Sequence, residues 1–202
     1  MSDPAQALVL PGAELTLWPA WLTLAEADAL FDTLHRAIAW ETHVIRLFGR
    51  EVASPRLSCW IGDPGASYVY SRTRFEPRPW PPALAALRGR VEAACGAGFN
   101  SVLANLYRDG DDAMGWHSDD EPELGPAPVI ASLSLGAERR LRFRRRPARA
   151  APVSGEATLD LRLPHGSLLR MAGATQRLYQ HALPRSSAVH APRISLTFRR
   201  IV

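Results

Sequence analysis

A short polar stretch, GWHSDD from Gly115 to Asp120, places one histidine and two carboxylates close together in the chain. Side chains alternate along an extended strand, so His117 and Asp119 would face one side and Ser118 the other. An imidazole and a carboxylate on one face can bind a metal ion. The H-x-D spacing is weak by itself, because the polar run from Asp109 to Glu123 is also typical of a solvated connection.

A third ligand would have to come from elsewhere in the chain. Two histidines and one carboxylate on one side of an iron ion leave three positions open, enough for a bidentate cosubstrate and oxygen. The later histidines that could complete such a site are His165, His181 and His190. The residues themselves leave the choice among these three open.

The C-terminal stretch RISLTFRR carries a second polar feature. Apolar residues alternate with polar ones, so Arg193 and Arg199 share the polar face of one predicted strand. Buried arginines need anionic partners. At about 3.3 Å per residue their Cα atoms lie about 20 Å apart, a gap that two leaning side chains bridge only if the strand curves or an elongated dianion lies between them. A dicarboxylate such as 2-oxoglutarate has that shape.

The composition indicates one globular domain over residues 1–202, large enough to bury a core without disulfides. The sequence shows neither an apolar run of about 18 residues, as a membrane span needs, nor a basic leader. We therefore expect a monomeric cytoplasmic protein that does not bind membranes. Cys59 and Cys95 are too few for a disulfide framework. All 24 basic residues are arginines, which suits phosphate binding but also fits a compositional bias.

Helical periodicity predicts two helices in the N-terminal half. Thr23 and Glu26 have the spacing of a capping box before the first apolar pattern, and the second pattern runs from about Pro82 to Cys95. Short runs broken by Gly, Pro and Asp predict strands at 43–52, 56–70, 101–107, 129–135, 141–145, 158–163, 167–171, 181–184 and 194–201. We predict an α+β, mainly β fold in which two helices support a jelly-roll core.

Six motifs together show a resemblance to a known family. They are N-x-Y-x-D-G at Asn105–Gly110, H-x-D-D-E at His117–Glu121, IASLSLGA at Ile130–Ala137, PHGSLLRM at Pro164–Met171, YQHALP at Tyr179–Pro184 and APRISLTFR at Ala191–Arg199. Over roughly residues 40–202 the chain resembles the AlkB family of Fe(II)- and 2-oxoglutarate-dependent nucleic-acid demethylases, and within it the homologues that repair duplex DNA. The resemblance implies a double-stranded β-helix (jelly roll) at about 100–202 and a nucleotide-recognition lid at about 40–80.

The resemblance implies Fe(II), 2-oxoglutarate and O2 as cofactor and cosubstrates. It selects His181 as the third iron ligand and leaves His165 and His190 as structural or exposed residues. The implied ligand sets are His117, Asp119 and His181 for Fe(II), and Asn105, Tyr107, Arg193 and Arg199 for 2-oxoglutarate.

The run SYVYS places Tyr68 and Tyr70 on one face of a predicted strand. Such a pair is by itself more typical of aromatic packing in a sheet, although two phenols could also enclose a base extruded from a duplex. The resemblance implies that a damaged base stacks between Tyr70, where the family often has Phe, and His117. The other residues that would line this pocket are Arg56, Tyr68, Asp120 and Glu121. A carboxylate there would favour the cationic lesions 1-methyladenine and 3-methylcytosine.

An apolar tip, Leu47-Phe48-Gly49, lies between arginines in a predicted hairpin where polar turn residues are usual. It resembles the finger with which duplex-repairing relatives fill the space left by an extruded base, although Phe48 buried under a sheet would also explain it. The arginine-rich run Glu138–Arg149 predicts contacts with phosphates. The arginines concerned are Arg139, Arg140, Arg142, Arg144, Arg145 and Arg146.

The implied reaction is the oxidative demethylation of an N-alkylated base in single- or double-stranded DNA, with release of succinate, carbon dioxide and formaldehyde. Three alternatives remain open at this point. The chain could perform the same chemistry on RNA or on protein side chains. It could be a nucleic-acid-binding β module without catalytic activity. It could also be a cupin-like barrel that binds a small molecule, but this would not explain the apolar tip.

Overall fold

The computed structural model of the chain describes residues 4–47, 50–70, 73–146 and 158–202. For strand residues 45–47, 50–52, 68–70 and 73–75 it describes the backbone alone. Phe48 and Gly49, at the predicted apolar tip, lie outside the described residues. None of the helices in these ranges is long and apolar enough to cross a membrane.

The described part of the chain is mainly β. Its helices are α1 (Leu24–Ala37), α2 (Pro82–Cys95) and α3 (Thr175–Leu178), with a short 3-10 helix, η1, at Pro122–Leu124. The strands are β1 (Gln6–Leu8), β2 (Glu14–Trp18), β3 (Glu41–Leu47), β4 (Arg50–Gly62), β5 (Tyr68–Tyr70), β6 (Thr73–Phe75), β7 (Ser101–Tyr107), β8 (Met114–His117), β9 (Ile130–Gly136), β10 (Arg139–Arg145), β11 (Thr158–Leu163), β12 (Leu168–Ala172), β13 (Tyr179–Leu183) and β14 (Arg193–Arg199).

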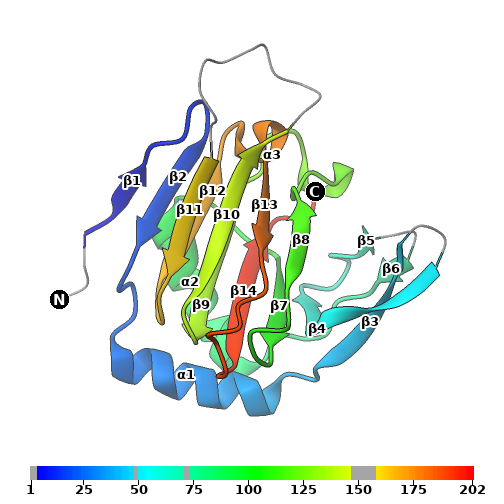
Figure 1. Cartoon of the computed structure of the whole chain (residues 1–202). Helices are drawn as coiled ribbons and strands as arrows, with labels where there is room; N and C mark the ends of the chain where they lie inside the picture. The colour runs from blue at the N-terminus through cyan, green and yellow to red at the C-terminus, as the bar shows by residue number, and fades with distance from the viewer. Residues whose placement is uncertain (1–3, 48–49, 71–72, 147–157) are drawn as a thin grey trace.

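Two antiparallel sheets form the body of the molecule. The eight-stranded sheet has the order β1-β2-β12-β9-β14-β7-β4-β3, and the four-stranded sheet has the order β11-β10-β13-β8. Figure 1 shows the smaller sheet in front of the larger one, with α2 behind the larger sheet and α1 along its lower end. The hairpin β5-β6 lies to one side. This is the predicted jelly-roll architecture, and the predicted fold class is confirmed.

The core has two layers because the strands of the larger sheet bury both faces. Ile194, Leu196 and Phe198 of β14 pack toward the helices, with Leu34 of α1 and Leu84 of α2. A second apolar cluster fills the space between the sheets. Alternation divides β12 between the two layers, because Leu168 belongs to the first cluster and its neighbour Leu169 to the second.

Both predicted helices are present. Thr23 caps α1, and the capping box with Glu26 is formed in both directions. The helix α2 begins at Pro82 and ends before Gly96, whose φ of 63° lies in the left-handed region that glycine adopts without strain. These local signals therefore placed the helices that cover the outer face of the larger sheet.

The predicted strand boundaries were wrong around Pro55. We expected a break between residues 52 and 56, but β4 continues through this point and pairs with β3 on both sides of it. The register shifts between Thr42 and Val44, where three residues of β4, 54–56, stand opposite one residue of β3. Proline has no N–H to donate, and a bulge of this kind accommodates it within a strand. The sequence patterns also missed β1 and β2.

Candidate metal centre and cofactor pocket

The three predicted iron ligands lie together on the inner face of the four-stranded sheet. His117 ends β8 and is directly opposite His181 on the neighbouring strand β13, while Asp119 follows two residues after β8. The possible ligand atoms of the three side chains all lie within 4.8 Å of one another. The imidazole centroids are 4.2 Å apart. Two imidazoles and one carboxylate in this arrangement could hold a divalent transition metal ion.

The protonation states favour metal binding. Burial, and then the nearby His117, lower the pKa of His181 to about 3, and burial also lowers the pKa of His117. Both rings are therefore neutral near pH 7, the form that binds metals. The Nδ1 of His117 is 2.9 Å from the Gly115 carbonyl oxygen. Since only an N–H can donate to a carbonyl, this contact leaves the Nε2 lone pair of His117 available to a metal ion.

Asp119 is ionised although it is buried. Burial alone would raise the pKa of its carboxyl group, but Arg199, His181 and His117 together lower it below the ordinary value. Nη2 of Arg199 donates a hydrogen bond to Oδ1 of Asp119 at 2.5 Å, while Oδ2 lies 3.7 Å from Nε2 of His181. Arg199 thus compensates the buried negative charge and leaves the second carboxylate oxygen directed toward the histidines.

Arg193, at the other end of β14, is also buried. Its Nη2 donates to the hydroxyl of Ser134 at 2.9 Å, and its guanidinium lies over the ring of Tyr107, 5.4 Å from the centroid. Burial lowers the pKa of Arg193 to about 10, so the side chain is still a cation near neutral pH. Its Nε is buried and makes no hydrogen bond with any described residue. A buried cation of this kind is suited to an anionic ligand.

A cavity of about 50 Å³ between the two sheets joins these groups. The polar residues that line it come from both sheets: Asn105, Tyr107, His117, Asp119, Ser132, His181, Arg193, Ser195, Thr197 and Arg199. The polar face predicted for the C-terminal strand therefore faces this cavity. The cavity has an arginine at each end, hydroxyl groups between the two arginines, and the metal ligands beside one end. This arrangement fits Fe(II) together with a dicarboxylate.

Comparison with known proteins identifies the family of the chain. Residues 14–199 match the model of the 2OG-Fe(II) oxygenase superfamily. The relatives include alpha-ketoglutarate-dependent dioxygenase alkB homolog 3 of Bos taurus, 41% identical over 194 residues (94% of this chain, 66% of the relative), and DNA oxidative demethylase ALKBH2 of Homo sapiens, 41% identical over 182 residues (88% of this chain, 70% of the relative). The chain belongs to the AlkB family. Its cofactor and cosubstrates are therefore Fe(II), 2-oxoglutarate and O2.

The solved structure of OsALKBH1 has a similar fold. It superimposes with a TM-score of 0.62 at 16% sequence identity and covers 98% of this chain and 100% of that one. At this identity the likeness concerns the fold alone. This AlkB-family chain spans 66% of the length of the alkB homolog 3 of Homo sapiens, which is 39% identical over 194 residues.

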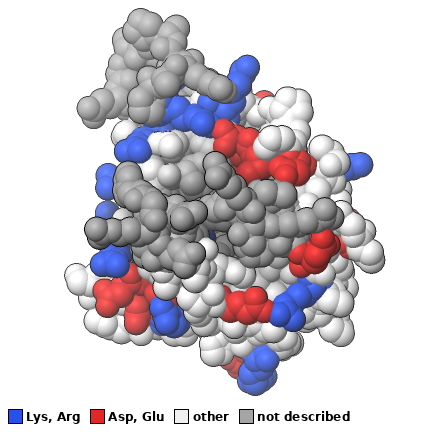
Figure 2. Space-filling model, turned by 90° about the vertical axis from the view of Figure 1, so that its right-hand side faces the viewer, with Lys and Arg blue, Asp and Glu red and all other residues white. Residues whose placement is uncertain are grey.

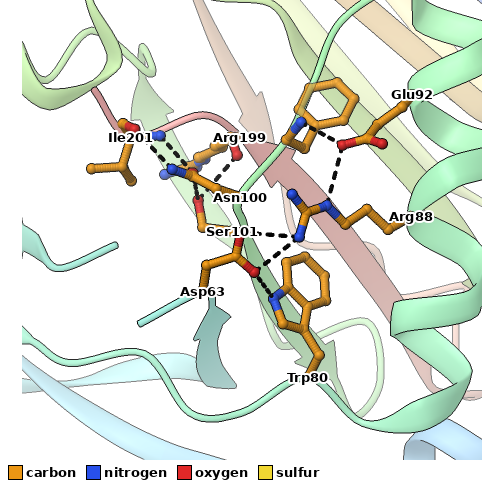
Figure 3. Close-up of polar contacts among 9 residues, drawn as sticks. Asp63, Trp80, Arg88, Glu92, Asn100, Ser101, Arg199 and Ile201 are labelled. Atoms are coloured by element: carbon orange, nitrogen blue, oxygen red, sulfur yellow. Dashed lines mark hydrogen bonds and ion pairs between the residues drawn. The ribbon is translucent and has the colours of Figure 1, made fainter. Parts of the chain in front are cut away.

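A polar network anchors the end of β14 that carries Arg199 (Figure 3). The side-chain amide of Asn100 donates to the Ile201 carbonyl and accepts the Ile201 N–H, both at 2.8 Å. The hydroxyl of Ser101 and the backbone N–H of Asn100 donate to the Arg199 carbonyl, both at 3.1 Å. These contacts fix the backbone from which Arg199 reaches Asp119. The side chains that tie α2 to the same corner are Asp63, Trp80, Arg88 and Glu92.

The residues predicted for the base pocket lie on several elements. Arg56 is buried on β4, and its Nε donates to Oδ1 of Asn105 at 2.8 Å, so it joins the pocket to the cofactor site. Asp120 is exposed and forms an ion pair with Arg146. Glu121 lies at the start of η1. Tyr68 and Tyr70 are on β5 and Leu47 ends β3, but the structure describes only their backbone.

The arginine cluster does not form one phosphate-binding surface, and the prediction for Arg139 was wrong. Arg139 is buried, 3% exposed. Its guanidinium donates to the carbonyl oxygens of Asp109, Asp112 and Pro184 at 2.7–2.9 Å, so it holds two loops together. The next residue, Arg140, points to the opposite side of β10 and is exposed. Because side chains alternate along the strand, odd- and even-numbered arginines of β10 lie on opposite faces of the sheet.

The remaining arginines of the cluster have different surroundings. Arg142 pairs with Asp160 at 2.8 Å, and Arg144 donates twice to Gln180 and lies over the ring of Trp116. Arg145 is half-buried over the ring of Tyr179. Arg146 donates to Asp120 and to the Gln176 carbonyl.

The predictions for His165, His190 and the cysteines are confirmed. His165 accepts a hydrogen bond from the Gly136 N–H and contacts Asp28, and His190 is exposed. Both cysteines are buried and unpaired.

Sequence patterns missed the residues that hold the site in place. Ser134 binds Arg193, and Gln176 accepts the Asp119 N–H. Neither belongs to a spacing that signals metal or carboxylate chemistry. They could only be found from the packing of strands and turns that are distant in sequence.

Proposed function

We propose that this chain is an oxidative demethylase that repairs N-alkylated bases, 1-methyladenine and 3-methylcytosine, in DNA. Membership of the AlkB family supports the reaction class, and relatives named DNA oxidative demethylase support DNA as the substrate. The observation that carries the proposal is the continuous cavity in which two neutral histidines and an ionised aspartate adjoin two buried arginines. Such a cavity is suited to a metal ion and a dicarboxylate bound side by side.

In this proposal His117, Asp119 and His181 hold Fe(II), and Arg193 and Arg199 bind the two carboxylates of 2-oxoglutarate. When bound, Fe(II), 2-oxoglutarate and O2 supply the oxidation of the methyl carbon, with succinate, carbon dioxide and formaldehyde as products. The protein contributes orientation and electrostatics. Arg199 has two roles, because it neutralises Asp119 through Nη2 and extends into the same cavity. Asn105 and Tyr107 add polar contacts to the cosubstrate.

The substrate base would enter from the side of β3–β6. Tyr70 and His117 would stack on the two faces of the extruded base, and Tyr68, Arg56, Asp120 and Glu121 would surround it. A base has to leave the duplex stack to reach a metal centre that lies between two sheets. The segment Leu47–Gly49, between β3 and β4, would fill the vacated space in a duplex. This role gives Leu47–Gly49 an effect on double strands that it would not have on single strands.

The outer face of the four-stranded sheet is proposed to contact phosphates. A groove of about 700 Å³ lies there, lined by Arg140, Arg142, Arg162 and Arg185 together with two carboxylates, Glu138, which pairs with Arg162, and Asp160, which pairs with Arg142. Arg140 and Arg162 are directly opposite each other on β10 and β11, and the side chain of Arg140 makes no hydrogen bond or ion pair with any described residue. Like charges in direct opposition are unfavourable. Arg162 pairs with Glu138 at 2.8 Å, so Arg140 is the side chain of this pair that is available to a phosphate. Figure 2 also shows basic and acidic side chains side by side on the face that it presents, so that face is not uniformly basic.

The test is formaldehyde release from oligonucleotides that carry 1-methyladenine or 3-methylcytosine, with Fe(II), 2-oxoglutarate and ascorbate. We expect lesion-dependent product from the wild type and none from His117→Ala. We expect Phe48→Ala to lower turnover on duplexes more than on single strands. Absence of lesion-dependent product from the iron-loaded wild type would contradict the proposal for DNA, and the same assay on methylated RNA would then decide between the two substrates. It remains a prediction that the chain forms one domain, is a monomer and lies in the cytoplasm.

A further inference from the structure

The metal-ligand segment Ser118–Asp120 lies outside the regular sheet. The strand β8 ends at His117, so no strand pairing holds the backbone of Asp119. His117 and His181 are fixed by their position in paired strands. Asp119 therefore needs another support if its carboxylate is to keep a fixed distance from the two imidazoles.

That support comes from Gln176 in the short helix α3. Its Oε1 accepts the backbone N–H of Asp119 at 3.0 Å, and its Nε2 lies 3.5 Å from the sulfur of Met171. Gln176 is 2% exposed, so water cannot take over either contact, and the loss of a contact would lower the stability of the folded chain. The orientation of the amide is fixed by chemistry, because the Asp119 N–H can only donate and must face an oxygen.

The contact is part of a set that ties the whole segment to α3. The hydroxyl of Ser118 donates to the Tyr179 carbonyl at 2.8 Å. Arg146 connects the carboxylate of Asp120 to the Gln176 carbonyl. Three consecutive residues after His117 are therefore bound, directly or through Arg146, to residues 176–179.

The helix α3 is itself fixed to the rest of the fold. The hydroxyl of Thr175 donates to the Ala172 carbonyl at 2.6 Å and accepts the Glu14 N–H at 3.0 Å. The hydroxyl of Tyr179 donates to the Pro11 carbonyl at 2.7 Å. Contacts to β2, β12 and the segment before β2 make α3 a rigid base from which Gln176 can hold the segment that follows β8.

We propose that Gln176 is a positioning residue for the metal centre: its buried amide holds the backbone of Asp119 in place and thereby sets the affinity of the His117–Asp119–His181 site for divalent metal ions. Groups that orient metal ligands typically contribute about 10- to 100-fold to metal affinity. Gln176 acts through Asp119 and contacts neither the metal nor the substrate. The inference rests on the proposed metal-binding role of the three ligands.

The test compares Mn(II) affinity, measured by the electron paramagnetic resonance signal of the free ion, among wild type, Gln176→Met and Gln180→Met. Gln180→Met is a matched control, because Gln180 precedes the metal ligand His181 but its amide binds Arg144 on the other side of the sheet. We expect Gln176→Met to weaken Mn(II) binding by about 10- to 100-fold and Gln180→Met to leave it unchanged. Equal Mn(II) affinity in Gln176→Met and wild type would overturn the proposal.

Two further measurements keep the test decisive if Gln176→Met does not fold. Gln176→Glu keeps an oxygen acceptor at the same position, and we expect it to bind Mn(II) at least as tightly as wild type; weak binding by a folded Gln176→Glu would contradict the inference. In wild type without metal, the Asp119 amide should exchange its proton slowly by NMR, and exchange at the rate of an unstructured peptide would also overturn it. These measurements do not involve turnover, so a failure of the demethylase assay and a failure of this inference can be told apart.

Discussion

Polar residues alternate with apolar ones along β14 and in the middle of β10, but the two strands have different surroundings. On β14, Arg193 and Arg199 face the cavity while the intervening apolar residues pack against the helices, and every residue is buried. On β10, Leu141 and Phe143 face the interior, and Arg140 and Arg142 are exposed on the other side. Alternation creates two faces in each case. What each face meets depends on the layers around the strand.

The position of each strand in the fold decides whether its arginines remain hydrated. β14 lies in the middle of the larger sheet, between the helices and the smaller sheet, so its arginines lose water and need anions. β10 belongs to the smaller sheet, and its exposed arginines remain hydrated. Substitution of a buried arginine of β14 should therefore have a very different effect from substitution of an exposed arginine of β10.

The largest expected effect is that of Arg199→Met in the metal-free protein. It leaves the Asp119 carboxylate buried without its guanidinium partner, which should lower the free energy of unfolding by about 3–5 kcal/mol. Urea unfolding measures the loss, and added Mn(II) should recover part of it, because a bound cation replaces the missing positive charge. A loss below about 1 kcal/mol, as for a surface ion pair, would contradict the buried contact.

Neighbouring arginines on β10 allow a sharper comparison of the two faces. Arg139→Ala removes the donors to three loop carbonyls and should lower the free energy of unfolding by about 3 kcal/mol. Arg140→Ala should change it by no more than about 0.5 kcal/mol. Arg140→Ala should instead weaken DNA binding and reduce its salt dependence, which a fluorescence anisotropy titration at several salt concentrations would measure. Equal loss of stability in both variants would contradict the placement of Arg139 on the buried face and Arg140 on the exposed face of β10.

Arg193→Met tests the other end of β14. Loss of a charge-assisted contact should weaken 2-oxoglutarate binding by about 10- to 100-fold, measured by calorimetry on the Mn(II)-loaded protein. Stability without 2-oxoglutarate should be unchanged or higher, since the variant removes a buried cation that pairs with no carboxylate among the described residues. An unchanged affinity for 2-oxoglutarate would mean that Arg193 is not an anchor for the cosubstrate.

The metal-free protein should lose stability as the pH falls below 6.5. The pKa of His181 is about 3 in the folded chain and 6.5 in the unfolded chain, so between these values only the unfolded chain binds the proton. The unfolded state is then favoured by about 1.4 kcal/mol per pH unit for this one group. Urea unfolding at pH 7 and pH 5 should show a smaller decrease in His181→Leu than in wild type. Equal decreases would contradict the lowered pKa.

Much of the fold and of the candidate site could be read from local patterns. A capping box and a left-handed glycine bound the helices, period-two alternation marks most strands, and the motifs at 105–110, 117–121 and 191–199 lead to the AlkB family. These signals work because each depends on residues that are close in sequence. By itself, the sequence determined the fold class, the family and the residues with suitable chemistry for a metal ion and a dicarboxylate.

Only the tertiary structure decided how those residues are supported. It showed that Arg139 holds loops while Arg140 is exposed, that β4 passes through Pro55 with a bulge, and that Gln176 holds Asp119 from 57 positions along the chain. The physical reason is the same in each case. Burial and hydrogen-bond partners depend on which strands and turns pack together, and a pattern of neighbouring residues does not contain that information.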